Sequence, residues 1–125
     1  MKIPIADGYP IIDLMTLEIL ARIKAWSGEE KKNLYRTRVW QKIAKIIKAY
    51  DRNECVCCRE AGKHSAAQLV HHVKNVKEHS DLALSTTYTE DGKVYRQLVS
   101  VCKQCHEREH EKDSEMKVEL TIERW

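Results

Sequence analysis

The most informative stretch of the chain is CKQCHEREH, residues 102–110, which brings two cysteines and two histidines close together. Its CxxC spacing occurs once more, at Cys55 and Cys58. Two such pairs on separate turns commonly hold one tetrahedral zinc ion, and zinc binding contributes roughly 10 kcal/mol or more to the folding of a small domain. We therefore predict a structural zinc site made by Cys55, Cys58, Cys102 and Cys105.

The fifth cysteine, Cys57, lies within the first pair. It could replace Cys55 or Cys58 as a ligand, but the resulting CC or CxC spacing is less favourable, so we expect a packed free thiol. Reducing compartments keep thiols free, and five cysteines in a chain of cytosolic character favour metal or redox chemistry over disulfides. A redox CxxC is the rival interpretation, and two separated pairs favour zinc over it.

The histidines are concentrated in one part of the chain, since all six lie between residues 64 and 110. His71 and His72 are adjacent, at the end of a short run suited to a strand. His106 and His110 are one helical turn apart, so both imidazoles can face one cation from the same side of a helix. Packing alone does not account for such clustering, and we expect these four histidines to form a site.

Three segments of the chain follow one known pattern. They are LVHHV at 69–73, QLVSVCKQCH at 97–106, and His110, and together they resemble the HNH nuclease family. Leu34-Tyr35, Trp40, the first cysteine pair and the run from His71 to Leu84 are similar to small HNH proteins of tailed phages and prophages. The resemblance covers about residues 34–110. It implies an α+β fold with a ββα-metal core, to which a four-cysteine zinc site and N-terminal helices are added.

Carried over residue by residue, the resemblance implies that His72 is the general base. His71, His106 and His110 would bind the catalytic cation, which would be Mg²⁺, Mn²⁺ or another divalent ion. Gln97 stands where the family usually has Asn, whose amide braces the loop and helps to orient the base, so we expect this bracing to be altered or lost. A regular strand points neighbouring residues to opposite faces. The strand should therefore end or bend at His71 and His72; otherwise one of them is structural and His72 stays in the site.

The resemblance implies an enzyme, a metal-dependent endonuclease that hydrolyses phosphodiester bonds of double-stranded DNA. It also suggests a phage or prophage setting, with phage packaging proteins as partners. The alternative is a non-catalytic, zinc-stabilised module that binds nucleic acid or protein, because a fold alone does not fix a function. Gln97 favours the binding module, whereas four imidazoles at ligand spacing favour the enzyme.

The positive charge of the chain is unevenly placed. Net charge is only +3, yet residues 29–50 hold seven Lys or Arg and two Glu. An amphipathic helix predicted over about 33–50 carries Lys42, Lys45 and Lys48, which are candidates for contacts to a nucleic-acid backbone. A solvated helix face is the ordinary alternative for such a charge-rich stretch.

The length of 125 residues fits one folding unit, in which we expect a helical extension over 1–32 and a zinc-stabilised HNH domain over 33–125. Apolar residues at helical spacing predict helices, and alternating apolar residues with turn residues predict strands and a hairpin. Besides the helix over 33–50, the expected elements are a helix over 11–26, a strand within 67–73, a hairpin turn at 90–93 between extended runs 86–89 and 94–101, a helix from Lys103, and an edge strand within 116–122.

The chain carries no continuous apolar segment of the kind needed for export or for a membrane span. Its longest apolar-rich stretch, residues 11–26, is interrupted by Asp13, Glu18, Arg22 and Lys24. We expect a protein without membrane contact, located in the cytoplasm, which would be that of the host cell for a phage-encoded chain.

Overall fold

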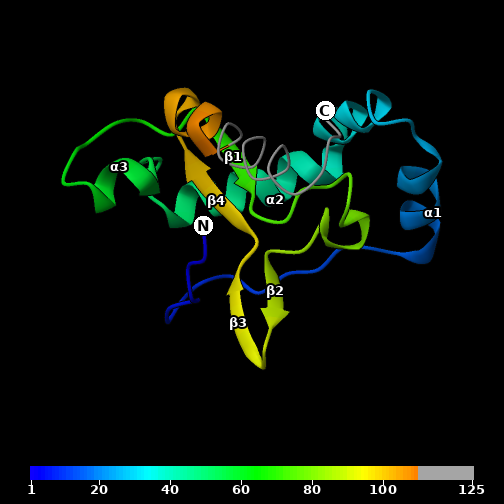
Figure 1. Ribbon diagram of the computed structural model, residues 1–125, viewed down its shortest axis with the longest axis horizontal. Helices are drawn as coiled ribbons and strands as arrows, with labels where there is room; N and C mark the ends of the chain where they lie inside the picture. The colour runs from blue at the N-terminus through cyan, green and yellow to red at the C-terminus, as the bar shows by residue number, and fades with distance from the viewer. Residues whose placement is uncertain (110–125) are drawn as a thin grey trace, which may run out of the picture.

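The structure is a computed structural model, and it describes residues 1–109. Figure 1 shows α2 crossing the centre of the molecule, with α1 and α3 towards its two sides. After the last strand of the described part of the chain, residues 103–109 are helical. The elements, in chain order, are α1 (Leu17–Ala25), η1 (Glu30–Arg36), α2 (Arg38–Tyr50), α3 (Val56–Glu60), β1 (Leu69–His72), η2 (Ser80–Leu82), β2 (Thr87–Glu90), β3 (Lys93–Arg96) and β4 (Leu98–Val101).

The centre of the fold is a two-stranded antiparallel sheet formed by β1 and β4. Leu69 pairs with Val101 and His72 with Leu98, so the end of β1 lies against the start of β4. The helical residues 103–109 follow β4 directly. Two strands and a helix in this order are the ββα unit that the sequence resemblance implies, and the predicted strand within 67–73 is confirmed.

Helix α2 packs one face on this sheet. The hydroxyl of Thr37 accepts a hydrogen bond from the backbone N–H of Trp40 and caps the helix. Trp40, Ile43 and Ile47 recur at helical spacing and are buried in the main core together with Leu98. Lys42 and Lys45, which lie between these positions, are exposed. The apolar face of α2 therefore fixes its basic side outward.

A second, smaller core lies around the cysteines. Val99 and Val101 of β4 are fully buried beside Val56 of α3, and Cys55 and Cys102 belong to the same cluster. The sheet thus contributes apolar side chains to both cores, and it connects the cysteine region to the face covered by α2.

The insertion between β1 and β4 contains a β-hairpin. Strands β2 and β3 pair from Thr87 with Arg96 to Glu90 with Lys93. Asp91 and Gly92 occupy the turn with φ values of 52° and 77°, a conformation that glycine and aspartate tolerate. The predicted turn at 90–93 is confirmed, and Figure 1 shows the hairpin extending away from α2.

The first helix is shorter than the sequence predicts. The expected helix over 11–26 is wrong for residues 11–16, because α1 begins at Leu17, where Thr16 caps it. The preceding backbone is held elsewhere: Leu14 N–H donates to the carbonyl of Leu84, and Thr86 N–H donates to the carbonyl of Ile12. Tertiary hydrogen bonds therefore keep these residues out of the helix, although their sequence has helical periodicity.

Two other predicted elements are interrupted. The helix expected over 33–50 is split at Thr37 into a 3-10 turn, η1, and α2. The extended run 94–101 is divided at Gln97 between β3 and β4. At both breaks a polar side chain forms hydrogen bonds with backbone groups. The hydroxyl of Thr37 accepts from the N–H of Trp40, and the amide of Gln97 bonds the N–H and the carbonyl of Lys74.

The N-terminal residues share the main core, since Tyr9 and Ile23 are buried in the same cluster as Trp40. The boundary between 32 and 33 stays a prediction. The edge strand expected within 116–122 lies outside the described residues. Across residues 1–109, none of the helices has the length and apolar character of a transmembrane span.

Candidate functional site

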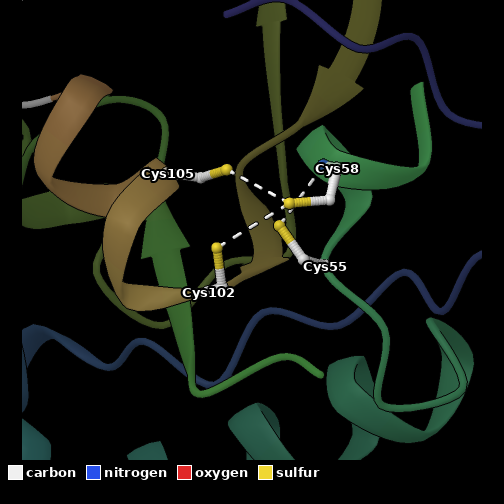
Figure 2. Close-up of side chains that lie close together, drawn as sticks. All are labelled: Cys55, Cys58, Cys102 and Cys105. Carbon is white, nitrogen blue, oxygen red and sulfur yellow. Dashed lines mark hydrogen bonds between the residues drawn. The ribbon is translucent and has the colours of Figure 1, made fainter. Parts of the chain in front are cut away.

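The four cysteines of the two CxxC motifs meet in one cluster. The Sγ atoms of Cys55, Cys58, Cys102 and Cys105 all lie within 4.8 Å of one another. Figure 2 shows the sulfurs pointing toward a common centre, one pair from each side. Cys58 Sγ is 3.9 Å from Cys102 Sγ and 3.6 Å from Cys105 Sγ. Four sulfurs around zinc, at about 2.3 Å from the metal, would be about 3.8 Å apart. The cluster fits a structural zinc ion.

Backbone N–H groups donate hydrogen bonds to two of these sulfurs, and such bonds stabilise the thiolate form that binds a metal. Cys55 caps the N-terminus of α3, and its Sγ accepts a hydrogen bond from the backbone N–H of Cys58 at 3.4 Å. The backbone N–H of Cys105 lowers the pKa of Cys102 to about 6, so this sulfur favours the thiolate form at neutral pH. Burial raises the pKa of Cys105 instead. Ionising all four thiols in one place needs a compensating positive charge, which zinc supplies.

Cys57 is outside this cluster although it lies between two of its members. It is half-buried, and burial raises the pKa of its thiol to about 11. The position of its sulfur, outside the group of four, therefore separates Cys57 from the ligands. The predicted division between four ligands and one spare thiol agrees with this geometry.

His71 and His106 bring the sheet and the last helix together. Their ring centroids are 5.2 Å apart in an edge-to-face arrangement. His71 is only 5% exposed. Neighbouring imidazoles from two elements can supply two nitrogen ligands to one cation. The third predicted ligand, His110, lies outside the described residues, and within residues 1–109 the cysteines are the only group of three or more candidate ligands at metal-binding distances.

His72 is held in place by Trp40 and Ala83, two residues that no sequence motif indicates. Its ring stacks on Trp40 with centroids 4.5 Å apart and an interplanar angle of 23°. Its Nε2 lies 3.0 Å from the carbonyl oxygen of Ala83. A carbonyl only accepts, so Nε2 carries the proton and Nδ1 is left with a lone pair. Burial lowers the pKa of His72 to about 4, which keeps the ring neutral at pH 7.

Strand β1 ends at His72, so the predicted end of the strand at the histidine pair is found. Within the strand the two rings diverge, His71 toward His106 and His72 toward Trp40. This is the alternation expected of neighbouring residues. Both histidines nevertheless line the same groove, together with Asn75 and Val76 of the loop that follows the strand.

Gln97 braces the loop that follows β1. Its side-chain oxygen accepts from the backbone N–H of Lys74 at 2.9 Å, and its side-chain nitrogen donates to the Lys74 carbonyl at 2.8 Å. Val73 N–H also donates to the backbone carbonyl of Gln97. Gln97 is fully buried. The longer amide therefore reaches the loop with both of its polar atoms, so the bracing is not lost.

A groove of about 950 Å³ connects these residues with the basic side of α2. His71, His72 and His106 line it, and so do Lys45 and Lys48. Lys42 is exposed on the same helix and is outside the lining. The groove is also lined by Lys31, Lys32 and Lys77, which were not among the predicted contacts. Lys31 and Lys32 belong to the basic stretch already noted, whereas no local signal distinguishes Lys77.

No protein-family model and no curated protein matches the sequence. Comparison with solved structures finds a match to the HNH endonuclease of the deep-sea thermophilic bacteriophage GVE2, solved with manganese ion. The TM-score is 0.58 at 20% sequence identity, and the alignment covers 82% of this chain and 98% of that chain. At this sequence identity the structural similarity shows a shared fold and no more. The chain has the fold of an HNH endonuclease, and the resemblance found in its sequence is confirmed at that level.

Proposed function

We propose that the chain is a metal-dependent DNA endonuclease. In this proposal His72 is the general base, and His71, His106 and His110 hold one divalent cation. The observation that carries it is the meeting of His71, His72 and His106 along one lysine-lined groove, in a chain with the HNH endonuclease fold. The four-cysteine cluster would hold zinc as a structural ion.

The contacts of His72 suit a base that must keep a fixed orientation. Donation from Nε2 to the Ala83 carbonyl selects one tautomer, and the stack on Trp40 restricts rotation of the ring. Nδ1 then accepts a proton from a water molecule as that water attacks phosphorus. Bond cleavage releases the 3′ oxygen and leaves a 5′ phosphate. Gln97 supports this arrangement by bracing the loop directly after the base.

His71 and His106 offer two imidazoles to the cation. A divalent cation there would neutralise charge on the phosphate and on the departing oxygen. Manganese is a cation to test first beside Mg²⁺, because the phage HNH endonuclease with this fold was solved with it. Lys45 and Lys48 line the same groove and are suited to contacts with neighbouring phosphates, and Lys42 is proposed as a contact further along the helix.

The proposal is tested by incubating supercoiled plasmid with zinc-containing protein and Mg²⁺, Mn²⁺ or EDTA. We expect cleavage with an added divalent cation, and a loss of about 10²–10⁴-fold in His72→Ala, the usual contribution of a positioned acid–base group. His72→Gln, which retains a donor for Ala83, should be inactive as well. The matched control is His64→Ala, since His64 is exposed and lies outside the groove. Cleavage by His72→Ala at the wild-type rate would remove His72 from this role.

The second candidate is a zinc-stabilised module that binds nucleic acid or protein without catalysis. The burial of His72, which is 6% exposed, favours it, because a buried and hydrogen-bonded histidine is also a common structural group. This alternative predicts that plasmid stays intact with every added cation while binding persists. The same incubation, followed by a gel-shift measurement, separates the two functions.

A further inference from the structure

The described residues with charged side chains that line the groove beside the histidines are all lysines. None of the described residues that line it is Asp or Glu. Lys31 donates to the carbonyls of Ile23 and Trp26, which fixes its position without neutralising its charge. Lys32 is paired with Glu29 at 2.9 Å, outside the lining. This arrangement matches a polyanion. The lysines that line the groove are Lys31, Lys32, Lys45, Lys48 and Lys77.

The same groove also has an apolar floor. Trp40, Ala44, Val70 and Val76 line the groove together with the lysines. Tyr35 lies in the lining with 47% of its surface exposed, and its ring packs edge-to-face on Trp40 with centroids 5.5 Å apart. The ring also lies beside that of His72, with centroids 6.1 Å apart. A half-exposed aromatic ring held by two neighbouring rings offers a stacking surface to a flat ligand.

Charge and apolar surface together discriminate between two forms of DNA. A duplex presents phosphates to the protein and hides the faces of its bases, so an apolar floor and an open ring would gain little from it. A single strand presents phosphates and base faces at once, and proteins bind it with basic grooves that contain aromatic rings. A volume of about 950 Å³ is near the upper end of small-ligand sites, roughly 300–1,000 Å³. It suits a short piece of one strand.

We propose that this groove binds one strand of DNA separated from its complement, with a base stacked on Tyr35 and phosphates beside Lys45 and Lys48. The inference rests on the proposed function for the choice of DNA as the polyanion. It adds that the strand approaching His71 and His72 is locally unpaired. The preferred substrates are therefore single strands, overhangs, flaps or distorted duplexes.

The direct test is fluorescence anisotropy with a short labelled oligothymidine and with the same oligonucleotide annealed to its complement. Zinc-containing protein is used without any other divalent metal, and a denaturing gel checks that the probe stays intact. We expect the single strand to bind about tenfold more tightly, the weight of roughly one stacked base. A surface that acts through charge alone would prefer the duplex, whose charge density is higher. Equal or tighter binding of the duplex overturns the proposal.

Substitutions then locate the strand. Tyr35→Leu should weaken single-strand binding about tenfold and leave duplex binding unchanged, while Tyr35→Phe, which retains the ring, should bind like the wild type. Lys45→Ala with Lys48→Ala should lower the salt dependence by about 0.7 in log–log slope for each lost phosphate contact. Lys63→Ala, at an exposed position outside the groove, is the matched control and should leave this slope unchanged. Equal single-strand affinity of Tyr35→Leu and wild type contradicts the stacking.

These measurements can fail independently of the proposed hydrolysis. If the strand binds through Tyr35 but no cation produces cleavage, the inference holds and the endonuclease proposal fails. If duplex plasmid is cut through His72 while Tyr35→Leu binds and cuts normally, the endonuclease proposal holds and the strand-binding inference fails. The comparison of single strand with duplex needs no variant, so a substitution that prevents folding does not remove the test.

Discussion

The cysteine cluster and the histidine groove are both built around the helical residues 103–109, yet they are assembled in different ways. Cys105 points into the cluster and the next residue, His106, approaches His71. The cluster is made by two local motifs whose spacing already suits a metal. The groove joins α2, β1, the 75–77 loop and η1, and its histidines depend on neighbours that are distant in the sequence.

This difference suggests a hierarchy between the two centres. Cys102 and Cys105 anchor the start of the helix to α3, and His106 follows within the same turn. Zinc at the cluster would therefore position a residue of the groove, whereas a cation at the histidines would leave the cluster intact. The dependence should run in one direction: loss of zinc should disrupt the histidine site, whereas loss of the histidine site should leave zinc bound.

Loss of a cluster ligand should have the largest effect. Cys105→Ser should release zinc and unfold the chain at physiological temperature, because roughly 10 kcal/mol or more of metal binding is comparable with the whole stability of a typical domain, about 5–15 kcal/mol. Atomic absorption measures the zinc, and circular dichroism measures the fold. Cys57→Ser is the matched control, and it should retain both. A folded, zinc-free Cys105→Ser protein would contradict the structural role of the cluster.

Loss of a groove ligand should act on activity alone. His106→Ala should weaken Mn²⁺ binding and plasmid cleavage by more than the roughly 10–100-fold typical of losing a residue that only supports a metal ligand. Its zinc content and thermal midpoint should stay close to those of the wild type. If His106→Ala lost zinc as Cys105→Ser does, the two centres would not be separable and the one-way dependence would be wrong.

Loss of the brace should have a smaller effect on stability. Gln97→Ala leaves the N–H and the carbonyl of Lys74 without their partners, which costs about 1–3 kcal/mol of unfolding free energy. Urea unfolding measures this loss, and cleavage should also fall because the loop after His72 is less fixed. Gln97→Asn should be intermediate, since its amide is one carbon shorter. Identical stability of Gln97→Ala and the wild type would show that the hydrogen bonds of Gln97 do not contribute to the unfolding free energy.

The local parts of the fold follow from the sequence. The two CxxC motifs predict the cluster, the apolar repeat predicts the buried face of α2, and Asp91-Gly92 predicts the hairpin turn. Each depends on residues close together in the chain. Such signals need no knowledge of the tertiary structure.

The parts that could not be predicted depend on distant contacts. The stack of Trp40 on His72 and the hydrogen bond to Ala83 join three separate segments, and no spacing rule indicates either contact. Residues 11–16 have helical periodicity but pair with 84–86. Gln97 reaches Lys74 because the loop after β1 folds back over it. Each case depends on a tertiary contact, and at residues 11–16 tertiary hydrogen bonds override a local helical preference.

We propose that two different centres share one helix, a zinc ion among the cysteines and an exchangeable cation beside the histidines. Anomalous scattering from crystals of the zinc-containing protein soaked in manganese chloride would locate both ions. We expect a zinc peak among the Sγ atoms of Cys55, Cys58, Cys102 and Cys105, and a manganese peak next to the imidazoles of His71 and His106. Manganese bound only elsewhere, or zinc at the histidines with none at the cysteines, would contradict it.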